Sequence, residues 1–129
     1  MLIQKGRRGL LYISGAFLIL FGIAGLYAPA TLAGKLGLTP TSPSGLSELR
    51  TLYGGGFAGF GITILAGLRH RAAGRGLLLG MGIIFACLTI GRLVSAAAGH
   101  DTLALKAAAT EAIMALLCYT ESRRAQARA

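Results

Sequence analysis

The feature that most constrains the fold of this chain is a series of long apolar runs with few or no charges. The first run, residues 10–28, contains no charged side chain. At a rise of about 1.5 Å per residue, a helix of this length nearly spans a hydrocarbon core of about 30 Å. Runs of this kind, separated by short clusters of arginine, are typical of a polytopic helical membrane protein.

The composition argues against a soluble globular domain. Hydrophobic residues make up 54% of the chain and charged residues only 13%, and the mean hydropathy is +0.68. This apolar content exceeds what the core of a soluble domain of this size needs. Residues 1–129 are therefore predicted to form a single transmembrane domain.

The runs predict an all-α, integral membrane four-helix bundle. The connection after the first span, residues 29–47, is rich in Thr, Ser, Pro and Gly, so residues 39–45 are predicted as a loop and Ser47 as the N-cap of the second span. The four predicted spans cover about residues 10–28, 46–68, 76–98 and 102–119.

The basic residues predict the orientation of the bundle. The formal net charge is +9, and the Arg and Lys residues are grouped at the ends of apolar runs, where the positive-inside rule expects cytoplasmic anchors. Both termini are then cytoplasmic, and the connections 29–47 and 99–101 are external. This placement argues against nucleic-acid binding and favours a multi-pass protein of the bacterial inner membrane. The three groups are Lys5/Arg7/Arg8, Arg69/Arg71/Arg75 and Arg123/Arg124/Arg128.

The first run also has some features of a cleavable signal peptide. Its start is basic, and it is followed by the small residues of Ala28-Pro29-Ala30. The run is longer than the usual apolar region of such a peptide, and a proline inside the cleavage site is unfavourable. We therefore expect the first span to remain in the mature protein.

Small residues four apart predict close helix packing. Such pairs let transmembrane helices approach closely, and four helices offer one another enough partners within one chain. An oligomer interface is the alternative use of the same faces. The pairs are Gly55/Gly59 in the second span, Gly76/Gly80 in the third and Ala108/Ala112 in the fourth.

Charged residues inside the spans predict a polar cluster in the outer half of the bundle. Ionisable groups at membrane depth are costly, face the bundle interior and pair with one another. Counting from the outer helix ends places Arg92 about 9 Å and Glu111 about 12 Å deep, with Glu48 and Arg50 within about 6 Å of the boundary. Tyr53 lies at a comparable level and adds a hydroxyl group.

Two interpretations of this cluster remain open. In the first, Arg92 pairs with Glu111, and Arg50 with Glu48 or a neighbour, and these salt bridges only hold the helices in register. In the second, the five residues line an outward-opening pocket that binds a small molecule, a lipid headgroup or a proton.

The same residues carry a resemblance to a known family. Glu48-x-Arg50-x-x-Tyr53-Gly54-Gly55, Gly91-Arg92-x-x-Ser95 and an isolated Glu111 resemble a family of small four-helix bacterial membrane proteins known only as a domain of unknown function, distantly similar to DoxX-like proteins. The resemblance covers nearly the whole chain and implies a four-helix bundle in the bacterial inner membrane. It implies no substrate or reaction. DoxX-like proteins are associated with respiratory or thiol-redox membrane complexes, but this chain lacks the paired cysteines for such chemistry.

No catalytic, metal or cofactor site is predicted. Cys87 and Cys118 differ in predicted depth by roughly 15 Å, beyond the reach of a disulfide. His70 is predicted cytoplasmic and His100 external, so they cannot share a metal or a haem. The chain also lacks a Ser/His/Asp set and a phosphate-binding loop in a soluble setting.

The chain is accordingly expected not to be an enzyme. The favoured hypothesis is an accessory or interaction protein that associates, within the lipid bilayer, with a larger membrane complex or with copies of itself. The alternative is a binding or transport module for a small molecule, a lipid or a proton, with Glu111 as the proton-labile group.

Overall fold

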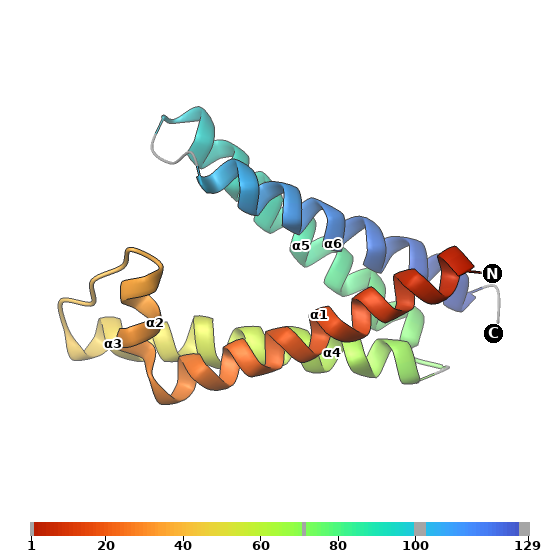
Figure 1. The fold of residues 1–129 in the computed structure, drawn as a ribbon, viewed down its shortest axis with the longest axis horizontal. Coiled ribbons are helices and arrows are strands. Elements are labelled where there is room, and N and C mark those ends of the chain that lie inside the picture. Colours follow the sequence, from red (N-terminus) through yellow and green to blue (C-terminus); the bar gives the residue numbers. More distant parts are fainter. Residues whose placement is uncertain (1, 71, 100–102, 127–129) are drawn as a thin grey trace. The chain divides into compact units, whose positions relative to one another are not determined.

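The computed structural model describes residues 2–70, 72–99 and 103–126, and nearly all of them are helical (Figure 1). No strand occurs among these residues. His100, most of the predicted connection 99–101 and the first residue of the fourth predicted span lie outside the described residues. The elements are α1 (Leu2–Tyr27), α2 (Pro29–Lys35), α3 (Pro43–Leu49), the π-helical segment η1 (Arg50–Gly56), α4 (Phe57–Arg69), α5 (Gly74–Ala97) and α6 (Leu103–Gln126).

Three continuous helical stretches are long and apolar enough to cross a membrane. They are Gly6–Tyr27, Pro43–Arg69 and Gly74–Ala97, and they correspond to the first three predicted spans. Within the described residues, α6 is not among them. It carries Lys106 and Glu111 in its apolar part and Glu121 beyond it, which lower its hydropathy.

The second stretch begins earlier than predicted. Pro43 occupies the first turn of α3, and the Ser42 side chain accepts a hydrogen bond of 3.1 Å from the Gly45 amide. A proline fits the first turn because its missing N–H would be unpaired there in any case. The prediction of Ser47 as the N-cap is therefore wrong, and part of the predicted 39–45 loop is the first turn of this helix.

The helices divide into two compact units. One comprises residues 12–65, and the other comprises residues 1–11 and 66–129. The first unit contains most of α1, all of α2, α3 and η1, and most of α4. The second contains the start of α1, the end of α4, and the α5–α6 pair.

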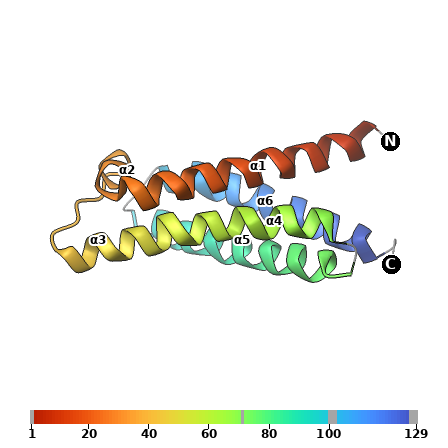
Figure 2. The same cartoon turned by 90° about the horizontal axis from the view of Figure 1, so that it is seen from below.

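In the first unit, α1 runs along η1 and α4 on a contact made of small residues (Figure 2). A Cβ atom at Gly25 would lie 2.6 Å from the carbonyl oxygen of Tyr53, and one at Gly22 would collide with the Ala58 amide and lie 2.6 Å from the carbonyl oxygen of Gly54. The two backbones therefore approach so closely that only glycine fits at these positions of α1.

The packing role predicted for Gly55 and Gly59 stays a prediction. A Cβ atom at either position would meet nothing within 4 Å, so neither glycine takes part in the contact with α1 inside this unit. The contact uses Gly54 and Gly61 instead, which face α1. Together with Ala58, which Gly22 approaches, these residues form an i, i+4, i+7 series on one side of the helix.

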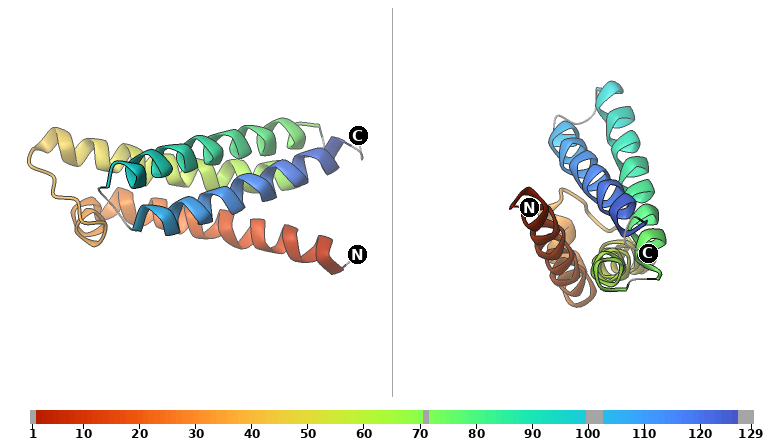
Figure 3. Two further views of the ribbon diagram at one scale, coloured as in Figure 1. Left: turned by 90° about the horizontal axis from the view of Figure 1, so that it is seen from above. Right: turned by 90° about the vertical axis from the view of Figure 1, so that its right-hand side faces the viewer.

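In the second unit, α5 and α6 lie side by side along their length (Figure 3). Leu78, Met81 and Phe85 of α5 are buried, as are Met114 and Cys118 of α6. These five are the larger buried side chains of the two helices.

The small pairs predicted in this unit differ in their surroundings, and their packing role stays a prediction. A Cβ atom at Gly76 or Gly80 would meet nothing within 4 Å, so these glycines face open space. Ala108 is buried, whereas Ala112 is exposed. The close approach occurs at Gly82, where a Cβ atom would lie 3.3 Å from the Ala115 carbonyl oxygen.

Candidate functional site

The structure joins two of the five residues of the predicted polar cluster. Arg92 of α5 and Glu111 of α6 form an ion pair, in which Arg92 Nε donates to Glu111 Oε1 over 3.4 Å. The Arg92 side chain is 45% exposed and that of Glu111 only 15%. The second carboxylate oxygen, Glu111 Oε2, is buried and has no hydrogen-bond partner in the described part of the chain.

The other three predicted cluster residues belong to the first unit. Glu48 of α3 and Arg50 of η1 have exposed side chains. Tyr53 is half-buried, and its ring stacks on that of Phe57 with centroids 5.7 Å apart and planes 8° from parallel. That all five residues line one site therefore remains a prediction.

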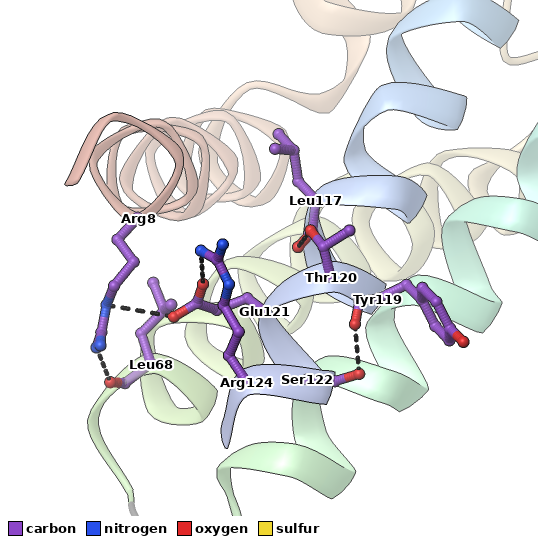
Figure 4. Close-up of polar contacts among 8 residues, drawn as sticks. All are labelled: Arg8, Leu68, Leu117, Tyr119, Thr120, Glu121, Ser122 and Arg124. Carbon is purple, nitrogen blue, oxygen red and sulfur yellow. Dashed lines mark hydrogen bonds and ion pairs between the residues drawn. The ribbon is translucent and has the colours of Figure 1, made fainter. Parts of the chain in front are cut away.

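A second charged cluster, which the sequence interpretation missed, lies at the ends of α1, α4 and α6 (Figure 4). Glu121 Oε1 lies 3.6 Å from Arg8 Nε, and Glu121 Oε2 lies 3.7 Å from Arg124 Nη1. Arg8 also donates from Nη2 to the Leu68 carbonyl oxygen over 2.7 Å. We call Arg8, Glu121 and Arg124 the charged clamp.

The clamp fastens three helix ends together. The Glu121 side chain is only 8% exposed, so its charge depends on the two guanidinium groups, which are about one-third exposed. Arg8 satisfies a carbonyl near the end of α4, where the helix dipole favours a positive charge. Neighbouring hydroxyls of α6 bond locally, with Thr120 donating to the Leu117 carbonyl and Ser122 to that of Tyr119.

Beside the clamp is a cavity of about 460 Å³. Its lining combines the polar side chains of Arg8, Arg69, His70 and Glu121 with apolar surface that includes Leu68 and Leu78. Two arginines, a histidine and one carboxylate thus line the same cavity. We call this the basic cavity.

Glu121 had a detectable signal in the sequence. It is the one acidic residue between the apolar part of the last helix and the basic tail. The charge pattern predicts that this helix end lies on the same side of the membrane as Arg8. Basic groups at helix ends are usually surface anchors, so their position alone does not indicate that Arg8 and Arg124 pair with Glu121.

An apolar groove of about 480 Å³ runs along the α5–α6 pair. Small residues of its lining, Gly82, Ala86 and Ala112, stand beside the large exposed side chains of Ile83 and Leu116. Thr89 also lines the groove, but its hydroxyl already donates to the Phe85 carbonyl over 2.9 Å. The groove therefore presents mainly hydrocarbon.

The described residues contain two thiols and one imidazole, that of His70. Cys87 is exposed and Cys118 buried, and both are free thiols. Across residues 2–70, 72–99 and 103–126, no group of three or more His, Cys, Asp or Glu side chains could hold a metal ion.

Comparison with known proteins identifies the family to which the chain belongs. Residues 7–120 match the family described as a domain of unknown function (DUF4345), which covers most of the chain, and the chain belongs to this family. No curated protein and no solved structure matches it significantly.

Proposed function

We propose that this family member is a multi-pass protein of the bacterial inner membrane, with α6 as a fourth span, both termini in the cytoplasm and a distant relation to DoxX-like proteins. Its three long apolar helices support the membrane location. The basic groups at the α4–α5 connection and at the end of α6 support the orientation, because such groups remain on the cytoplasmic side.

Within that membrane, the protein acts as a non-enzymatic interaction protein. The observation that carries this proposal is the apolar groove on α5 and α6. Helices in lipid associate where small residues let backbones approach, and the exposed Ala86 and Ala112 provide such a surface beside the larger Ile83 and Leu116. The occupant is an apolar transmembrane helix of another protein, since the groove offers such a helix packing surface and almost no polar partner.

Site-specific photocrosslinking in native membranes tests this proposal. A photoreactive residue at Leu116, which lines the groove, is expected to give one discrete adduct with a heterologous membrane protein. The same residue at Leu105, which is 56% exposed but does not line the groove, is expected to give none.

A matched pair of substitutions makes the test specific. Ala112→Leu fills the groove and is expected to abolish the adduct, whereas Ala109→Leu, also at an exposed alanine of α6, is expected to preserve it. Adducts with lipid alone, or with a second copy of this chain, would contradict a partner helix. An adduct that survives Ala112→Leu would also contradict it.

A second candidate function rests on Glu111. Its buried Oε2 has no partner in the described residues, while Oε1 pairs with Arg92, so the carboxylate has room for one further donor or a proton. In this alternative the chain binds a small molecule, a lipid or a proton in the outer half of the bundle. A small molecule that native mass spectrometry detects on the gently extracted protein, and that Glu111→Gln removes, would favour this function over the first.

A further inference from the structure

The basic cavity has more positive charge than its structural role requires. Arg8 uses Nε toward Glu121 and one N–H of Nη2 toward Leu68, which leaves part of its five-donor fork available. Arg69 is exposed and lines the cavity, and the charged clamp is complete without it.

The position of Arg69, the arginine that the charged clamp does not use, is also informative. Arg69 is the last residue of α4 and the end of a stretch able to cross a membrane. A cavity at that point lies at headgroup level if the chain spans the membrane as proposed. Basic pockets at the cytoplasmic ends of transmembrane helices are favourable sites for anionic headgroups.

We propose that the basic cavity binds an anionic phosphate group, and that its source is the headgroup of an anionic phospholipid. Guanidinium groups match phosphate oxygens in bidentate geometry, and Arg8 and Arg69 place two of them on the same cavity. A volume of about 460 Å³ is within the range of small-ligand pockets and exceeds what a bare phosphate fills. Leu68 and Leu78 provide apolar surface for the glycerol end of the lipid.

Glu121 has a defined role in this arrangement. Its carboxylate holds Arg8 in place and repels an anion from the clamp side of the cavity. The phosphate is therefore directed toward Arg69 and His70, away from Glu121. This makes Arg69 the informative residue for a test, because its loss leaves the clamp intact.

Native mass spectrometry of the purified full chain in detergent tests the proposal, with phosphatidylglycerol and phosphatidylcholine supplied in equal amounts. The wild-type protein is expected to retain phosphatidylglycerol preferentially. Arg69→Gln is expected to lower that retention about tenfold, the effect of losing one charge-assisted hydrogen bond. Arg75→Gln is the matched control, since it removes the same charge from an exposed residue of α5 that does not line the cavity.

A second variant guards against a folding defect. Ala125→Leu partly fills the cavity without altering any charge and is expected to lower retention as well. Glycerol 3-phosphate is added as a competitor. Displacement only at a large excess over the lipid supports a phospholipid whose phosphate occupies the cavity. Displacement at a concentration equal to that of the lipid would overturn the lipid source in favour of a free phosphate ligand, and no displacement at any concentration would overturn the phosphate site.

Equal losses of phosphatidylglycerol retention in Arg69→Gln and Arg75→Gln would overturn the cavity as the binding site. Such losses would reflect only the general attraction of a basic protein for an anionic lipid. Equal retention of phosphatidylcholine and phosphatidylglycerol would overturn the anionic selectivity. Neither result depends on the apolar groove, so this experiment can fail while the partner-helix proposal stands.

Discussion

Gly22→Val is expected to lower the free energy of unfolding in detergent by about 3 kcal/mol, the upper end of the usual cost of overpacking. A Cβ atom at Gly22 already collides with the Ala58 amide and lies 2.7 Å from the Ala58 side chain. Backbone cannot move aside as a flexible side chain can, so α1 must separate from η1 and α4. Reversible unfolding, followed by circular dichroism, measures the loss.

Gly59→Val is the matched control for this prediction. It makes the same change in a neighbouring helix, at a glycine whose Cβ position is open, and valine and glycine differ by less than about 0.5 kcal/mol in helix propensity. Its stability is expected to stay close to that of the wild type. Similar losses at both positions would contradict the placement of the α1 contact on Gly22.

Arg8→Met is expected to lower the free energy of unfolding by about 2 kcal/mol. Breaking a fully buried pair costs about 3–5 kcal/mol because an unpaired charge is left behind. The cost is smaller here, because Arg8 is 33% exposed and Arg124 continues to pair with Glu121. The double variant Arg8→Met/Glu121→Met is expected to recover part of the loss, since neither charge then remains buried.

A double-mutant cycle measures that recovery as a coupling energy. The same cycle on Arg92 and Glu111 is expected to give a coupling as well, because the Glu111 side chain is only 15% exposed and pairs with Arg92. Strictly additive losses for Arg8 and Glu121 would show that the charged clamp does not hold the helix ends together.

Much of the helical architecture follows from sequence alone. Uninterrupted apolar runs predicted the three long helices, because hydropathy and length are properties of the sequence. The start of α3 was misplaced because the cap of Ser42 and Pro43 lies in a segment whose composition resembles a loop.

The helix-packing face was harder to predict. The run Gly54-Gly55-Gly56 offers three possible registers, and a spacing of four singled out Gly55 and Gly59. The face toward α1 carries Gly54, Ala58 and Gly61, which follow the ordinary i, i+4, i+7 spacing of one side of a helix. The same spacing rule therefore fits the Gly55/Gly59 face and the Gly54/Ala58 face equally, and spacing alone does not choose between them.

The two charged sites differ in how predictable they were. Arg92 and Glu111 lie at similar predicted depth within apolar runs, so the cost of an isolated charge indicated a pair. Glu121 lies among arginines at a helix end, where charges cost little. Its burial follows only from the three-dimensional packing of α1, α4 and α6.

The most direct test of the membrane account is single-cysteine labelling in intact cells, in a background where Cys87 and Cys118 are replaced. Ser44→Cys probes the end of the molecule that contains α2 and the start of α3, and it leaves the Ser42 cap in place. Ala73→Cys probes the α4–α5 connection. Both positions are exposed. An impermeant maleimide is expected to label residue 44 from outside and residue 73 only after the membrane is opened. Labelling of residue 73, but not of residue 44, in intact cells would contradict the proposed orientation.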